Sequence, residues 1–155
     1  MKRILFVCHG NICRSPMAEY IMKQLVREQG REQEFLIDSC AVSTEEIGND
    51  IYPPAKRILK EKNIPFEKHK ARQITREDFA DFDYIVCMDE YNLRWLRNIA
   101  RSYVCQPQYE KKISLMMQWA GEDREVADPW YTGNFEKTYN DLYRACQAML
   151  LEVGS

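Results

Sequence analysis

Short apolar runs alternate along this chain with longer stretches in which apolar residues recur at helical spacing. The apolar runs at residues 4–7, 35–39 and 84–88 predict buried strands, and the last, fully apolar, is typical of a central strand. Residues 111–117 predict a weaker fourth strand. Because strands alternate with helices, we expect an α/β fold with one parallel sheet and helices on both faces. Ligands of such sheets bind beyond the carboxyl ends of the strands.

Start and stop signals bound the predicted helices. We expect the first helix to begin at Pro16, with Ser15 as its N-cap, and to stop near Gly30. Residues 128–131 are expected to form a loop that is free to close over a site. The other helices are expected to begin at residues that carry known start signals: Pro53, Thr75 (in a capping box with Asp78), Asp89 and Asn134.

Length, composition and charge narrow the class of protein. The 155 residues suit a single domain, residues 1–155, and 45% apolar with 30% charged residues is typical of a soluble globular chain. The net charge of −2, with no basic block, gives no support for nucleic-acid binding. No apolar run approaches the ~20 residues that span a membrane, and we expect no secretory signal. We therefore expect a cytoplasmic protein.

Cysteine usage agrees with a reducing compartment. A chain of this size does not need disulfides, and Cys87 on a strand and Cys146 on a helix are expected to be buried free thiols. There is no Cys-x-x-Cys, and two histidines are too few for a convincing zinc site, so we expect no metal. The six cysteines are Cys8, Cys13, Cys40, Cys87, Cys105 and Cys146.

Residues 8–14, here called the anion loop, lie between the first strand and the first helix. A loop of this kind turns successive backbone N–H groups inward, and the helix end adds partial positive charge, so an anion is favoured. Arg14 can hold two phosphate oxygens, and the same positive field favours the thiolate of Cys8 at the base of the loop. A thiolate beneath a bound phosphate is a nucleophile aimed at phosphorus.

A passive role for Cys8 is the alternative. A lone cysteine is usually a small buried hydrophobe, and Cys-x5-Arg occurs by chance. The preceding strand, the Gly10-Asn11 pair inside the loop and the Ser-Pro helix start all agree with an anion site. No Gly-Lys-Ser/Thr follows, so this is not the ATP-binding type of loop.

Four segments in order resemble the low-molecular-weight protein tyrosine phosphatases: residues 7–16, 37–39, 69–73 with 82–89, and 128–131. The resemblance covers the whole chain. It implies a three-layer, flavodoxin-like domain with four parallel strands in the order 2-1-3-4. It also implies hydrolysis of phosphotyrosine and aryl phosphates through a phosphocysteine, without metal or cofactor.

The resemblance also implies a role for each site residue. Cys8 would be the nucleophile, Arg14 the phosphate clamp, and Asp128 the general acid and then base. The remaining loop residues would bind phosphate: His9, Gly10, Asn11, Ile12 and Cys13. Others would support the thiolate and the loop: Ser15, Asn11, Ser39 and His69, the histidine as a structural residue rather than a base.

Redox control and substrate choice are further expectations from the resemblance. Cys13 would form a disulfide with Cys8 under peroxide and so protect it, without being essential for turnover. Relatives that act on phosphoarginine carry Thr where this chain has Ile12, so an aromatic phosphate is favoured. The substrate rim would comprise Ile12, Glu45, Trp130 and Tyr131.

Several departures from the family leave points open. Cys40 stands where relatives usually have Gly or Ala, and is either a tolerated small residue or an extra thiol near the site. Glu45 replaces a rim aromatic of some eukaryotic relatives, and an acidic rim would disfavour acidic phosphopeptides. Trp130 replaces the first of two adjacent tyrosines that can be phosphorylated in eukaryotic relatives, leaving only Tyr131 for such regulation.

Two other functions compete with the phosphatase. A thiol-dependent arsenate reductase of the same fold passes a disulfide to cysteines about seven residues apart, whereas Cys87 has no cysteine near Arg94 and the next is Cys105. A non-catalytic phosphate-binding or redox-sensing module would not need the complete set of reactive residues. We expect phosphotyrosine proteins as substrates, inorganic phosphate or similar oxyanions at the loop, and a monomer, with weak self-association left open.

Overall fold

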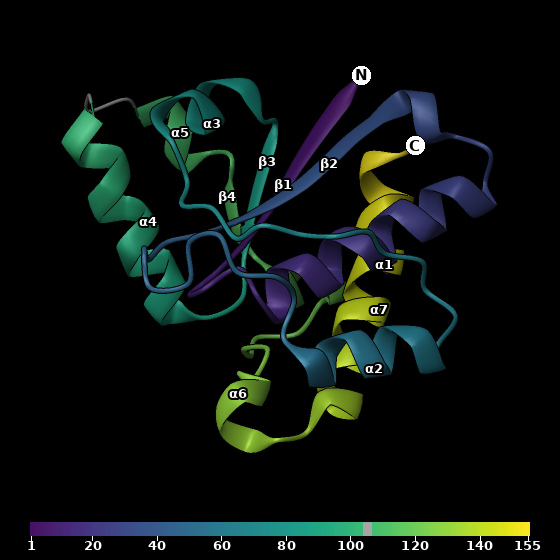
Figure 1. Cartoon of the computed structure of the whole chain (residues 1–155). Helices are drawn as coiled ribbons and strands as arrows, with labels where there is room; N and C mark the ends of the chain where they lie inside the picture. The colour runs from purple at the N-terminus through teal and green to yellow at the C-terminus, as the bar shows by residue number, and fades with distance from the viewer. Residues whose placement is uncertain (104–106) are drawn as a thin grey trace.

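The structure is a computed structural model that describes residues 1–103 and 107–155. Its centre is a parallel sheet in the order β2-β1-β3-β4 (Figure 1). The two inner strands, β1 and β3, are flanked by helices on both faces, which confirms the predicted three-layer fold and strand order. The strands are β1 (Lys2–Cys8), β2 (Phe35–Ala41), β3 (Tyr84–Cys87) and β4 (Ile113–Leu115).

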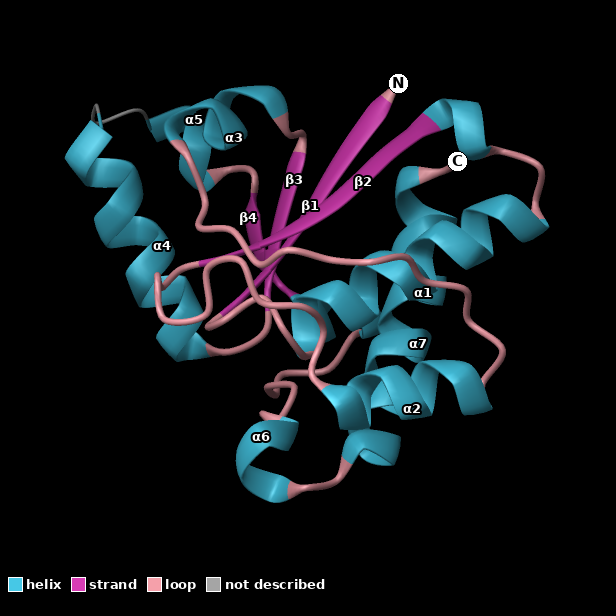
Figure 2. Ribbon diagram, viewed as in Figure 1, coloured by secondary structure: helices cyan, strands magenta, loops and turns pink. Residues whose placement is uncertain are grey.

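Helices cover the two faces of the sheet in two groups (Figure 2). The larger group packs beside β1 and β2 and comprises α1 (Arg14–Glu28), α2 (Pro53–Glu61) and α7 (Phe135–Val153). The other group comprises α3 (Arg76–Asp81), α4 (Glu90–Tyr103) and the short α5 (Pro107–Glu110). The short helix α6 (Pro129–Thr132) lies beyond the sheet, and 3₁₀ turns span Glu32–Glu34 and Met116–Ala120.

Strand β1 supplies both halves of the core. Ile4 and Phe6 belong to the cluster under α1, α2 and α7, whereas Leu5 and Val7 belong to the cluster under α3 and α4. All four are fully buried, because successive side chains of a strand point to opposite faces and both faces are covered. The carboxyl end of β1 is therefore fixed at the centre of the molecule.

Three local predictions are wrong: the start of the first helix, the length of the fourth strand and the loop at residues 128–131. Helix α1 begins at Arg14, with Cys13 at its N-cap position, because the Ser15 hydroxyl contacts Cys8 and the Asn11 side chain instead of capping the helix. The fourth strand spans only three residues, since the chain turns into a 3₁₀ helix at Met116.

Residues 128–131 do not form the predicted loop. Asp128 caps α6 through the backbone N–H of Trp130, Pro129 occupies the first helical position, and Gly133 ends the helix at φ 72°.

Three other predicted helix ends are confirmed: the capping box of Thr75 with Asp78, the stop at Gly30 and the N-cap Asn134.

The cysteines agree with the expectation in part. Cys87 and Cys146 are buried free thiols, as predicted, and burial raises the pKa of each. Cys105 lies outside the described residues. None of the helices in the described ranges is long and apolar enough to cross a membrane.

Candidate active site

The carboxyl ends of β1, β2 and β3 meet beneath the anion loop. Cys8 is the last residue of β1 and pairs with Ala41 of β2, and its side chain is almost completely buried. Its Sγ lies 3.0 Å from the Ser15 Oγ and accepts the backbone N–H of Asn11 at 3.3 Å. The N–H group donated by Asn11 favours negative charge on sulfur, and the Ser15 hydroxyl lies between this sulfur and the Cys40 carbonyl oxygen, 3.3 Å away.

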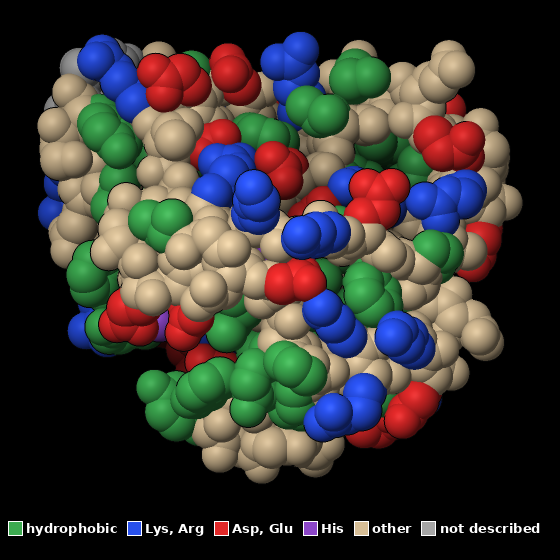
Figure 3. Space-filling view, viewed as in Figure 1, with side chains coloured by type: hydrophobic (Ala, Val, Ile, Leu, Met, Phe, Trp, Pro, Cys, Tyr) green, Lys and Arg blue, Asp and Glu red, His purple; other side chains and the backbone are tan. Residues whose placement is uncertain are grey.

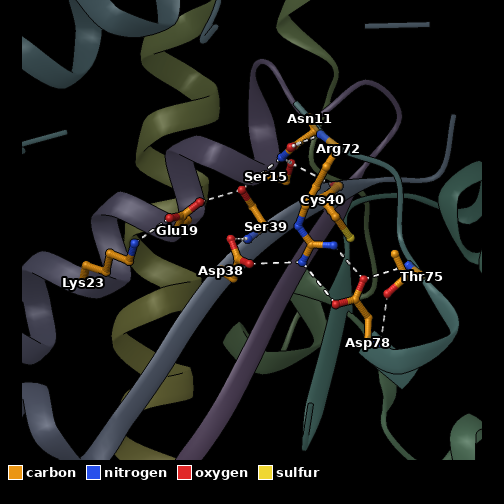
Figure 4. A network of polar contacts seen from close by, with 10 residues as sticks. All are labelled: Asn11, Ser15, Glu19, Lys23, Asp38, Ser39, Cys40, Arg72, Thr75 and Asp78. Carbon is orange, nitrogen blue, oxygen red and sulfur yellow. Dashed lines mark hydrogen bonds and ion pairs between the residues drawn. The ribbon is translucent and has the colours of Figure 1, made fainter. Parts of the chain in front are cut away.

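Asn11 holds the anion loop in its curved shape. Its backbone is left-handed, with φ 63°, a conformation that Asn tolerates better than most residues. Its Nδ2 donates to the Ser15 Oγ at 2.8 Å and to the Ser39 Oγ at 3.0 Å (Figure 4). Its Oδ1 accepts the Arg72 backbone N–H at 3.1 Å, and its carbonyl oxygen lies 2.7 Å from the His69 Nε2.

A further row of polar groups lies behind this network. The Ser39 hydroxyl donates to the buried Glu19 carboxylate at 2.6 Å. The Arg72 guanidinium donates to both oxygens of Asp78, at 2.7 and 3.1 Å, and to Asp38 at 3.1 Å (Figure 4). Because buried polar groups are costly unless paired, this satisfied network favours one arrangement of the loop.

Arg14 lies at the base of the site, 2% exposed. Its Nη1 donates to the Asp89 Oδ2 at 2.7 Å and to the Val126 carbonyl at 2.9 Å, while its Nη2 lies 3.4 Å from the Asp128 Oδ2. Burial alone would lower the pKa of Arg14, but the neighbouring charges of Cys8, Asp128 and Asp89 raise it overall. The guanidinium therefore remains a cation in the site.

Asp128 reaches the site from the far end of the chain. As the N-cap of α6, its Oδ1 accepts the Trp130 backbone N–H at 3.0 Å, which leaves Oδ2 directed to Arg14. The side chain is 26% exposed, so it can exchange protons with solvent. A carboxyl group thus faces the same space as the Cys8 thiol and the Arg14 guanidinium.

These side chains open onto one cavity, here called the main cavity. Most of the predicted site residues line this cavity. Four do not, and form the hydrogen-bond network behind its wall: Asn11, Ser15, Ser39 and His69. The whole predicted rim, Ile12, Glu45, Trp130 and Tyr131, lines it. The lining residues are Cys8, His9, Gly10, Ile12, Cys13, Arg14, Glu45, Glu46, Asp128, Trp130 and Tyr131.

The other thiols near the loop are buried and protonated. Burial, and next the negative charge of Cys8, raise the pKa of Cys13 far above its usual range. Cys40 pairs with Val7 in the register and packs in the same cluster, on the face of the sheet opposite Cys8. Burial raises its pKa as well, so Cys40 is a passive core residue.

Three residues of the site were not predicted from the sequence: Asp89, Arg72 and Glu46. Asp89 was expected only to cap α4, which it does through the Asn92 N–H at 2.7 Å, but its other oxygen holds Arg14. Its place directly after β3, the neighbour of β1, is the signal that could have revealed it. Arg72 and Glu46 do not directly follow a strand, so the sequence does not mark them. Only the folded loops bring them close to the anion loop. No group of three or more metal-ligating side chains occurs among the described residues.

Comparisons with known proteins agree on one family. A family model, "Low molecular weight phosphotyrosine protein phosphatase", matches residues 3–155. The protein of that name from Homo sapiens is 42% identical over 153 residues, 96% of this chain and 94% of that protein. The low-molecular-weight protein tyrosine phosphatase SP-PTP of Streptococcus pyogenes is 40% identical, with a TM-score of 0.88 over 100% of this chain and 95% of that one. The Drosophila arginine phosphatase DARP is 34% identical, with a TM-score of 0.90 over 100% and 99%.

Asn11→Ala is expected to weaken binding of inorganic phosphate roughly ten- to hundredfold, because the three side-chain hydrogen bonds that orient the loop are lost. Asn63→Ala is the matched control, since Asn63 also has a left-handed backbone, φ 59°, but ends α2 away from the site. Titration calorimetry measures both affinities. Equal phosphate affinity in Asn11→Ala and the native protein would contradict the role given to Asn11.

Proposed function

The chain belongs to the low-molecular-weight phosphotyrosine protein phosphatase family, and we propose that it hydrolyses phosphotyrosine through a phosphocysteine formed on Cys8. One observation carries the assignment of roles: the thiol and the guanidinium of the anion loop and a carboxyl group from a segment far along the chain open onto one cavity, the main cavity. A nucleophile, a clamp for phosphate oxygens and a proton donor are the groups that this reaction needs.

In the first step, the Cys8 thiolate attacks phosphorus. The S–P bond forms as the P–O bond to the tyrosine oxygen breaks, and Asp128 gives its proton to the leaving phenolate. Arg14 and the backbone N–H groups of the anion loop bind the equatorial phosphate oxygens, on which the charge of the transition state lies. The Ser15 hydroxyl, 3.0 Å from the Cys8 sulfur, stabilises the thiolate before attack and after release.

In the second step, water attacks the phosphocysteine. Asp128, now a carboxylate, accepts a proton from the water as the new P–O bond forms and the S–P bond breaks. Inorganic phosphate and the Cys8 thiolate result. When phosphate occupies the loop it competes for the Arg14 Nη2, which in the free enzyme lies 3.4 Å from Asp128. Phosphate binding thus frees the Asp128 carboxyl group for proton transfer.

Substitution of the two reacting groups separates their roles. Cys8→Ser is expected to lower kcat for p-nitrophenyl phosphate by at least roughly 10³-fold, because the nucleophile is lost. Asp128→Asn is expected to cost roughly 10²–10⁴-fold with phenyl phosphate but far less with 2,4-dinitrophenyl phosphate, whose leaving group needs no proton. Steady-state kinetics without metal measures both effects.

Cys146→Ala is the control for the loss of a thiol and is expected to leave kcat unchanged. Cys146 is buried in the core and does not line the main cavity. Equal losses with both leaving groups would remove Asp128 as the acid. Undiminished turnover in Cys8→Ser would remove the phosphocysteine.

The mouth of the main cavity suits an aromatic phosphate ester. Trp130 and Tyr131 are exposed, and the Tyr52 ring lies 4.6 Å from that of Trp130, which braces it. Ile12 supplies an apolar surface within the same cavity. A flat phenyl ring can stack among these side chains, whereas a guanidinium would leave N–H groups against apolar surface. The similarity to an arginine phosphatase makes phosphoarginine the alternative substrate to test.

The native enzyme is expected to hydrolyse a phosphotyrosine peptide with a kcat/KM about tenfold or more above that for the matched phosphoarginine peptide. Ile12→Thr, which places a hydroxyl in the anion loop, is expected to narrow this ratio. Ile47→Thr makes the same change at an exposed residue outside the main cavity and should preserve it. A native preference for phosphoarginine would overturn the assignment.

Cys13 is proposed to protect Cys8 from irreversible oxidation. Peroxide oxidises the Cys8 thiolate to a sulfenic acid and is itself reduced to water. The Cys13 thiol then displaces water from the sulfenic acid, forming a Cys8–Cys13 disulfide that dithiothreitol reduces. The raised pKa of Cys13 keeps it protonated, so peroxide reacts first at Cys8.

After peroxide treatment, Cys13→Ser is therefore expected to regain less activity with dithiothreitol than the native enzyme does. Cys40→Ala removes a neighbouring buried thiol on the other face of the sheet and should recover fully. Activity before and after reduction is the measurement. Full recovery of Cys13→Ser would show that Cys8 needs no resolving thiol.

We further propose a reducing, cytoplasmic compartment, in which the five described cysteines, all free, would remain reduced. A monomer is also proposed, since the chain covers both faces of its sheet with its own helices.

A further inference from the structure

A second cavity, here called the side cavity, adjoins the main cavity on the side of α4. Its volume of about 450 Å³ lies within the range of small-ligand sites. It shares five lining residues with the main cavity: His9, Arg14, Glu45, Asp128 and Tyr131. The start of α4 adds Asp89, Tyr91 and Asn92. The proposed reaction leaves the outer part of this cavity without a role.

The side cavity carries an excess of negative charge. Among the described residues that line it, the carboxylates are Glu45, Asp89 and Asp128, against the single permanent cation Arg14. Arg14 already contacts two of them, and the Glu45 side chain is 68% exposed, with its Oε2 2.9 Å from the His9 Nε2. Figure 3 shows acidic side chains (red) bordering a recess next to the hydrophobic side chains over α6. Such a surface favours a positively charged group.

Exposed aromatic rings flank the same cavity. Tyr91 is 47% exposed and Tyr131 84% exposed. The Tyr91 ring lies 5.9 Å from the His9 ring and 6.1 Å from the Trp95 ring, so it is held between two neighbours while one side remains open. An exposed tyrosine ring attracts a guanidinium or ammonium group to its face.

Asn92 supplies an unpaired donor to this cavity. The residue is fully buried, and its Oδ1 accepts the Met88 backbone N–H at 3.1 Å. Its Nδ2 has no hydrogen-bond partner among the described residues. Because a buried N–H group left unpaired is rare, this donor indicates an acceptor from outside the chain. Because this Nδ2 is closed to bulk solvent, one water molecule would have to link it to a main-chain carbonyl of a bound peptide.

We propose that the side cavity is a substrate subsite for an arginine or lysine side chain next to the phosphotyrosine of a peptide, an inference that rests on the proposed phosphatase function. The peptide carbonyl is linked to Asn92 by a water molecule, and the cationic group lies between Tyr91 and Glu45. The shared wall of the two cavities places this subsite within reach of a residue adjacent in sequence to the phosphotyrosine. Phosphotyrosines with basic neighbours are thereby the preferred substrates.

Two phosphotyrosine peptides that differ only in their residues flanking the phosphotyrosine, both Arg or both Glu, test this proposal. The native enzyme is expected to show a kcat/KM ratio of about tenfold in favour of the Arg peptide, from one ion pair and one cation–π contact. Glu45→Gln and Tyr91→Ala are each expected to reduce the ratio to about threefold or less, and Tyr91→Phe to restore it, because the ring face is kept.

Glu46→Gln is the matched control. Glu46 lines the main cavity but not the side cavity, so its neutralisation should change the ratio least. Equal rates for the two peptides in the native enzyme, or an unchanged ratio in both Glu45→Gln and Tyr91→Ala, would overturn the subsite while leaving the phosphatase function in place. Failure to hydrolyse p-nitrophenyl phosphate as well as both peptides would overturn the phosphatase function and the subsite together.

Discussion

The left-handed backbone and the side-chain amide of Asn11 are the constraint on which the rest of the site depends. The residue directs its backbone N–H to the Cys8 sulfur, while its amide ties the anion loop to Ser15 and Ser39. Without this turn the loop N–H groups would not converge on one anion, and the thiolate would lose a donor. The partly buried ion pairs of Glu19 with Lys23 and of Arg72 with Asp78 lie behind the same residue and hold its partners in place.

Arg14 contacts two carboxylates in the free enzyme, and substrate redistributes these contacts. Arg14 contacts Asp89 firmly and Asp128 more weakly, at 2.7 and 3.4 Å. A bound phosphate can therefore take the Nη2 of Arg14 from Asp128 while Asp89 continues to orient the guanidinium. In the proposed mechanism, one carboxylate has a positioning role and the other is available for proton transfer, a division set by the distance of each from the same cation.

Much of this could be predicted from the sequence where local signals act alone. Apolar runs identified β1 and β3, and the anion loop identified Cys8 and Arg14, because strand, loop and helix start are adjacent in the chain. The capping box of Thr75 with Asp78 could also be predicted, because its two residues are close together in the sequence. Ser15 was misassigned because its hydroxyl has two competing uses, and only the fold shows that contacts to Cys8 and Asn11 win over the cap. The contacts of Asp89 and Arg72, and the side cavity, form only when the fold brings distant segments together. Patterns within one segment of the sequence cannot predict them.

The assignment of the nucleophile is tested most directly by rapid acid quenching of the native enzyme during turnover of p-nitrophenyl phosphate, followed by mass spectrometry of the peptide that contains residues 8–14. We expect one phosphoryl group on Cys8 of the native enzyme, and a smaller amount of this species in Asn11→Ala because its loop is less well ordered for attack. Turnover without phosphorylated Cys8, or phosphate found instead on His9, would contradict the mechanism.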